Sequence, residues 1–163
     1  MDTQYAKRTY GIKRIWHKLL FHVAYNFPFI KAEIRAKIHA AAGVKIAKPS
    51  STFIGQYVYF DDLYPEDISV GEGTIITSGC KILTHFIDPR WGDYNHMRRG
   101  KVNIGNHVFI GMNTVIVKPI TIGDYAVIGA NSVLTKDVPP YSIVAGNPAK
   151  VIKQREIIYQ DEL

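Results

Sequence analysis

Pairs of isoleucine and glycine recur at a spacing of six residues in this chain. They are Ile104-Gly105, Ile110-Gly111, Ile122-Gly123 and Ile128-Gly129, and Ile116-Val117 keeps the spacing without the glycine. A fixed period is considered first, because it decides the whole architecture. Six residues fit neither a helix, whose period is near 3.6, nor a β-sandwich, whose turn signals come every 8–12 residues. The period therefore predicts a β-solenoid, in which short strands alternate with corners.

The period extends over nine hexapeptides, each of which starts with an aliphatic residue. The nine starters are Val70, Ile76, Ile82, Ile104, Ile110, Ile116, Ile122, Ile128 and Leu134. The residue four positions later is small or β-branched in all but Phe86, so both positions are expected to face a narrow core. The residue three positions after each starter is often Gly, Asn or Asp, which tolerate left-handed backbone angles, and it is expected to form a corner. Three hexapeptides make one triangular coil, which predicts coils over 70–87, 104–121 and 122–139, with an insertion over 88–103.

The residues outside this period divide the chain further. Residues 1–43 are expected to form a helical cap, because apolar residues recur there at helical spacing; these are Ile12, Ile15, Trp16, Leu19, Leu20 and Val23. We expect this stripe to cover the open end of the solenoid, and the alternative is a weak contact with a membrane or a lipid-linked substrate. Residues 44–152 are assigned to the solenoid, irregular over 44–69, and residues 153–163 to a tail.

Composition and charge limit the classes of partner. The formal net charge is +6, but no aromatic-basic stripe indicates nucleic-acid binding. An anionic membrane near the N-terminus and a phosphate-rich small ligand near the C-terminal basic residues remain as explanations. No apolar run is long enough for a transmembrane helix, and no signal-peptide pattern is present. The single cysteine, Cys80, falls on an inward position and is expected to fill the core, which agrees with a cytoplasmic protein.

The strongest chemical signal is Thr84-His85, directly before the insertion. His85 falls on a corner position, so its ring is expected to point outward beside the wall that the insertion forms. A neutral imidazole there can take a proton from an attacking hydroxyl or amine, although a lone histidine can equally be structural or simply exposed. In the insertion, Trp91 and Tyr94 offer flat faces to a sugar ring, and its arginines can meet an anionic group. A solvated loop is the alternative reading of this segment.

Residues 44–152 resemble the hexapeptide-repeat acyltransferases, and most of all the maltose/galactoside and polysaccharide O-acetyltransferase branch. The likeness rests on Thr84-His85, the runs 104–111 and 128–139, and the closing segment 145–152. It implies a left-handed parallel β-helix, a homotrimer with active sites between subunits, and direct transfer from acetyl-CoA. In this resemblance His85 matches the catalytic general base.

The resemblance also implies binding residues. Asp61 resembles a carboxylate that binds the acceptor, with Asp62 as its rival. On the acetyl-CoA side the matching residues are Phe109 beside the pantetheine arm, Gly111 and Ala130 as small positions along it, Thr135 and Lys136 at the phosphates or adenine, and Lys150 and Lys153 at the 3′-phosphate. Lysine keeps the charge of the arginine that relatives carry there but loses its two-pronged geometry. No metal is expected.

We therefore expect an acetyl-CoA-dependent O-acetyltransferase that acts on a sugar or related acceptor. An N-acetyltransferase acting on an amino sugar is the alternative within this class. A zinc carbonic anhydrase of the same fold would need three converging histidines, and the spacing of His85, His96 and His107 does not resemble that family. A non-catalytic scaffold is disfavoured by the intact Thr84-His85 pair and by Lys136.

Overall fold

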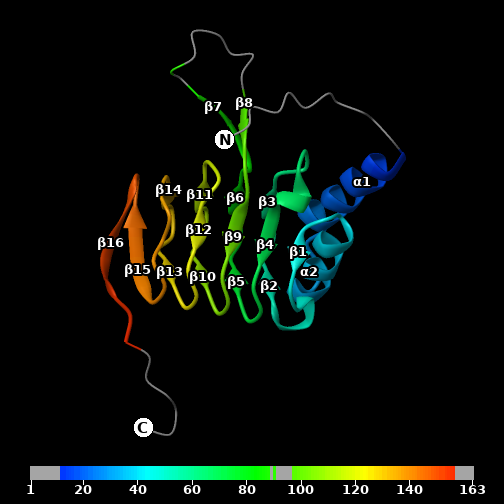
Figure 1. Cartoon of the computed structure of the whole chain (residues 1–163). Coiled ribbons are helices and arrows are strands. Elements are labelled where there is room, and N and C mark those ends of the chain that lie inside the picture. Colours follow the sequence, from blue (N-terminus) through cyan, green and yellow to red (C-terminus); the bar gives the residue numbers. More distant parts are fainter. Residues whose placement is uncertain (1–11, 89, 91–96, 157–163) are drawn as a thin grey trace, which may run out of the picture.

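The computed structural model describes residues 12–88, 90 and 97–156. Short parallel strands stack into three sheets, and each of the first four turns of the coil supplies one strand to each sheet (Figure 1). Sheet A contains β1 (Lys45–Ile46), β4 (Ile68–Val70), β9 (Val102–Ile104) and β12 (Thr121–Ile122). Sheet B contains β2 (Phe53–Ile54), β5 (Ile75–Ile76), β10 (Phe109–Ile110), β13 (Val127–Ile128) and β15 (Ser142–Gly146), and β16 (Ala149–Gln154) pairs antiparallel with β15. Sheet C contains β3 (Tyr59–Phe60), β6 (Lys81–Ile82), β11 (Val115–Ile116) and β14 (Val133–Leu134).

The inward positions of the repeat form the core, as the sequence predicts. All nine starters are at most 3% exposed, and eight of the nine residues four positions later are also buried. The exception is Phe86, which lies outside the coil. Cys80 is buried and donates its thiol to the carbonyl oxygen of Gly111, and burial raises the pKa of this thiol. The expectation that Cys80 fills the core is confirmed.

The first coil is more regular than the sequence suggested. In β1, β2 and β3, residues Ile46, Ile54 and Phe60 stand in register with Val70, Ile76 and Ile82 of the next coil. The six-residue period is hidden in the sequence because two short 3-10 helices, η1 (Pro49–Ser51) and η2 (Pro65–Asp67), lengthen two of its corners. The description of residues 44–69 as irregular was therefore wrong for these strands.

The corner prediction holds at two of the three corners. Positive φ angles occur at Gly73, Gly79, His107, Asn113, Tyr125 and Asn131. The third corner lies between sheets C and A and carries His85, Pro119 and Asp137, which do not take positive φ. His85 instead begins β7 (His85–Ile87), which pairs antiparallel with β8 (Met97–Arg99) in a hairpin that leaves the coil. The hairpin thus begins before residue 88, and Trp91 and Tyr94 lie outside the described residues.

Two helices, α1 (Ile12–Asn26) and α2 (Ala32–Ala41), cover the first coil at one end of the stack (Figure 1). The predicted contact face of α1 was wrong for Ile12, Ile15, Trp16 and Leu19, which are exposed. Leu20 of the predicted stripe packs against the core, and Phe21 and Ala24 are buried. The buried Arg35 of α2 explains this rotation, because its guanidinium donates to the carbonyl oxygens of Ala24 and Phe27 as well as Ile54. Among the described residues, no helix combines the length and the apolar character needed to cross a membrane.

Candidate functional site

Asp61 and His85 meet at the corner between sheets C and A. Asp61 follows β3 in the first coil, and Thr84 and His85 follow β6 in the second coil. The coil register joins these segments, since the Asp61 amide donates to the carbonyl oxygen of Ile82. The Oδ2 atom of Asp61 lies 2.6 Å from Nδ1 of His85, so two residues that are 24 positions apart in sequence form one pair.

The carboxylate of Asp61 is fully buried and both its oxygens are occupied. Oδ2 accepts hydrogen bonds from the amide and the hydroxyl of Thr84, at 3.0 and 2.6 Å, and Oδ1 accepts from the amide of Leu63 at 3.1 Å. Buried carboxylates are stabilised by such donors. These contacts fix the position of Asp61 behind the imidazole ring, and the sequence-based expectation that this carboxylate binds the acceptor stays a prediction.

The pairing sets the chemistry that the imidazole can perform. A carboxylate only accepts hydrogen bonds, so the ionised Asp61 selects the tautomer of His85 with the proton on Nδ1. The lone pair is then on Nε2, and the side chain of His85 is 22% exposed. A histidine oriented in this way can accept a proton from a bound hydroxyl and release it later.

Tyr64 and Arg99 complete the surroundings of His85. The sequence did not identify Tyr64, and it offered Arg99 only as one of the arginines of the insertion. Tyr64 is buried, and its ring lies edge-on to His85 with centroids 5.8 Å apart. The guanidinium carbon of Arg99 lies 3.8 Å from the centre of the Tyr64 ring, and this guanidinium also pairs with Asp67 and Glu66. The signal that could have revealed the place of Arg99 is the hairpin register, which sets it opposite His85.

The described arginines of the hairpin are engaged within the chain. Arg90 and Arg98 both pair with the buried carboxylate of Asp88, and the hydrogen bond from Arg90 holds the pKa of this carboxyl well below its usual range. Together with Arg99, these contacts anchor the base of the hairpin. The idea that these arginines meet an anionic group of the acceptor finds no support in these contacts.

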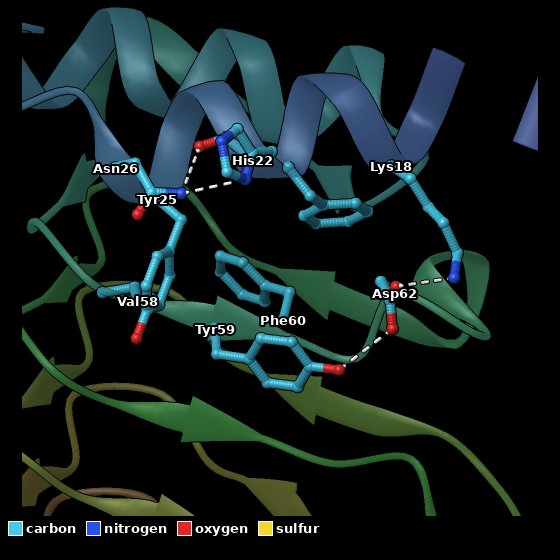
Figure 2. A pocket seen from close by; sticks show the side chains of 9 residues that line it. Lys18, His22, Tyr25, Asn26, Val58, Tyr59, Phe60 and Asp62 are labelled. Atoms are coloured by element: carbon cyan, nitrogen blue, oxygen red, sulfur yellow. Dashed lines mark hydrogen bonds and ion pairs between the residues drawn. The ribbon is translucent and has the colours of Figure 1, made fainter. Parts of the chain in front are cut away.

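A pocket of about 360 Å3 lies between α1 and β3, next to Asp62 (Figure 2). Its apolar lining includes Phe21, Val58 and Phe60, and Lys18 and Asp62 lie together at one end with Nζ and Oδ2 3.5 Å apart. The hydroxyl of Tyr59 donates to Asp62 at 3.0 Å, and burial together with this carboxylate raises the pKa of Tyr59 to about 12. Asp62, unlike Asp61, therefore points into a space that is large enough for a small ligand.

The residues expected to hold acetyl-CoA fall into separate groups. Thr135 and Lys136 follow β14 at the same corner at which Thr84 and His85 follow β6. Phe109 lies on the outer face of sheet B and is 39% exposed. The remaining four are Gly111 and Ala130, which are stacked neighbours after β10 and β13, and Lys150 and Lys153, which are exposed on β16.

Sheet B and the corner that carries His85 lie on opposite sides of the three-sided coil. Phe109 and His85 of one chain therefore cannot line the same groove. Within the described ranges, no three His, Cys, Asp or Glu side chains gather as ligands for a metal ion.

Comparison with known proteins confirms the predicted resemblance. Residues 101–136 match the model of the bacterial transferase hexapeptide (six repeats). YvoF from Bacillus subtilis (strain 168) is 40% identical over 115 residues, which are 69% of this chain and 62% of YvoF, so the chain spans less than two thirds of that relative.

Solved structures agree with this comparison. A maltose O-acetyltransferase from Clostridium difficile 630 superposes with a TM-score of 0.59 and 26% identity, covering 89% of this chain and 87% of that one. A galactoside acetyltransferase in complex with coenzyme A shares the fold at 24% identity, with a TM-score of 0.63 and coverage of 88% and 81%.

Proposed function

We propose that this chain, which carries the bacterial transferase hexapeptide repeat, is an acetyl-CoA-dependent O-acetyltransferase acting on a hydroxyl of a sugar or related acceptor. The observation that carries the proposal is the buried Asp61 carboxylate, 2.6 Å from Nδ1 of His85. The similarity to a maltose O-acetyltransferase supports transfer to oxygen and a sugar acceptor. We also infer left-handed winding of the coil and action in the cytoplasm, the latter from the single cysteine.

In the proposed mechanism His85 is the general base. Its Nε2 removes the proton from the acceptor hydroxyl as that oxygen attacks the thioester carbonyl, so that a new C–O bond forms and the C–S bond breaks. The proton then passes from Nε2 to the departing thiolate of coenzyme A, which leaves the enzyme unchanged. Asp61 is a positioning residue, because it holds Nδ1–H and stabilises the imidazolium during the transfer. Asp62 is our candidate for a direct contact with the acceptor.

The described residues fit a long ligand that carries phosphate groups. Lys136, Lys150 and Lys153 are exposed cations that can attract the phosphates of acetyl-CoA, and Phe109 offers a flat apolar surface to the pantetheine arm. Acetyl-CoA, when bound, supplies the activated acetyl group. The chain supplies the base and the binding surface.

We infer a homotrimer with one site at each subunit boundary. The outer side chains of sheet B form an apolar row in register, namely Phe53, Ile75, Phe109, Val127 and Ile143. The matching row on sheet A is polar and consists of Lys45, Ser69, Asn103 and Thr121. An exposed apolar row of this kind indicates a subunit contact. In such a trimer we expect Phe109 of one chain to lie toward the His85 corner of another.

The test is acetyl transfer measured by thiol release over a panel of sugars, amino sugars and simple alcohols. His85→Ala should lower turnover by roughly two to four orders of magnitude. His107→Ala is the matched control, because His107 is an exposed histidine at another corner of the coil. Turnover of His85→Ala close to that of wild type would remove the general-base role, and transfer to amines alone would replace O- by N-acetylation.

A further inference from the structure

The exposed side of α1 is an apolar stripe. Ile12, Ile15, Trp16 and Leu19 are 78%, 62%, 60% and 49% exposed, and they recur at the spacing of one helix face. The opposite side of α1 is occupied, since Phe21 and Ala24 are buried against the rest of the chain. The four stripe residues are therefore not used to pack α1 onto the coil. They include Trp16, and tryptophan is enriched at membrane–water interfaces.

The positive charge of the chain is concentrated in the same part of the sequence. Residues 12–48 contain eight basic residues and one acidic residue, whereas residues 49–163 contain ten basic and twelve acidic residues. This segment includes both helices and β1, which lie at one end of the stack (Figure 1). Lys31, Lys37 and Lys45 are exposed there. Arg14, Lys18 and the buried Arg35 bond within the chain, and the first coil adds Asp61, Asp62, Glu66 and Asp67 at this end. One end of the molecule thus combines an apolar stripe with exposed lysines.

We propose that this end docks on an anionic phospholipid membrane, with α1 lying in the plane of the interface. The stripe inserts at the boundary between headgroups and acyl chains, and the surrounding basic residues contact the lipid phosphates. An anionic bilayer is the occupant that matches both properties, because it offers an apolar layer directly beneath a negatively charged one. The inference does not depend on the acetyltransferase proposal.

The test is binding of the full chain to vesicles of phosphatidylcholine with phosphatidylglycerol, measured by co-sedimentation. We expect binding that weakens in high salt and is much lower on pure phosphatidylcholine. The variant Ile15→Ser/Trp16→Ser should bind at least about tenfold more weakly, because two inserted apolar side chains are lost. Val151→Ser/Ile152→Ser is the matched control, because these residues are 52% and 63% exposed on β16, and its binding should equal that of wild type.

Insertion of the stripe gives a second measurement. In a Trp91→Phe background Trp16 is the remaining tryptophan, and its emission should shift to shorter wavelength on anionic vesicles. Absence of binding, or equal binding of the stripe variant and wild type, overturns the proposal. Sedimentation velocity without vesicles tests the alternative occupant, a second copy of this chain. If the stripe variant changes the oligomeric state and wild type does not bind vesicles, the face is a contact between copies. Thermal melting of each variant verifies that it is folded.

Discussion

Replacing His39 by phenylalanine should make the stability of the protein less sensitive to acid. His39 lies in α2, is fully buried, and both its ring nitrogens lack a hydrogen-bond partner within the described part of the chain. Its ring packs against Phe21 and Phe60, with centroids 5.4 and 4.8 Å away. Burial, reinforced by the nearby charge of Arg35, lowers the pKa of His39 to about 3 from an ordinary value of 6.5.

The sign and size of the effect follow from this difference in pKa. Above pH 6.5 the imidazole is neutral in both the folded and the unfolded state, so it adds no pH dependence. Below pH 6.5 His39 is protonated in the unfolded chain but stays neutral in the folded chain. The free energy of unfolding therefore falls with pH until the pH approaches the folded pKa near 3. Between pH 7.5 and pH 5.0 this costs about 2 kcal/mol, because one pH unit is worth about 1.4 kcal/mol.

The assay is urea unfolding of wild type and His39→Phe at pH 7.5 and pH 5.0. The measured quantity is the change in unfolding free energy between the two pH values, which is independent of any constant cost of fitting the larger ring. The variant should lose about 2 kcal/mol less than wild type over this range. His107→Asn is the control, because His107 is exposed at a corner where asparagine also fits, and it should behave as wild type. Equal pH dependence of wild type and His39→Phe would refute the reasoning.

Four other substitutions test the site and its support. Asp61→Asn should lower kcat by roughly two to four orders of magnitude and alter the acidic limb of the pH–rate profile, because an amide no longer selects the Nδ1–H tautomer; an unchanged profile would leave only a structural role. Lys150→Ala should raise the KM for acetyl-CoA with little change in kcat, and an unchanged KM would argue against a phosphate contact. Gly111→Ala should lower the melting temperature, because its Cβ would lie 2.5 Å from the backbone nitrogen of Ala130; a melting temperature like that of wild type would contradict the tight coil stacking. Arg35→Met should cost roughly 3 kcal/mol in urea unfolding, since it removes three hydrogen bonds to carbonyl oxygens; a loss below about 1 kcal/mol would contradict the role of Arg35 in fixing α1.

The repeat made the coil predictable because each position has the same surroundings in every turn. Ile76, Ile110 and Ile128 stack in register, so the burial of one predicts the burial of the others. The face of α1 was not predictable in this way. A helix with apolar residues on two opposite faces leaves the choice to tertiary contacts, and here the hydrogen bonds of Arg35 to Ala24 and Phe27 select the face with Phe21 and Ala24.

The candidate site was predictable only where it coincides with the repeat or with a family motif. Thr84-His85 marks the point at which the period stops, and this identified the histidine. The position of Asp61 depends on hydrogen bonds that link two coils, which sequence spacing does not encode once η2 (Pro65–Asp67) lengthens the intervening corner. Arg99 depends on the register of a hairpin that lies outside the six-residue period, and Tyr64 lies directly before η2 in a lengthened corner.

The stacking of coils places the general base and its partner on different turns of the chain, so their geometry depends on the register of the first coil. Asp61 is held at the height of His85 because Tyr59 and Phe60 pair with Lys81 and Ile82. A slip of one residue in β3 would turn Tyr59 inward and carry the carboxylate away from the imidazole. The buried ring of Phe60 opposes such a slip, and His39 of α2 packs directly against that ring. The helical cap therefore supports the Asp61–His85 pair through Phe60, and it does so from the same end of the molecule that we assign to the membrane.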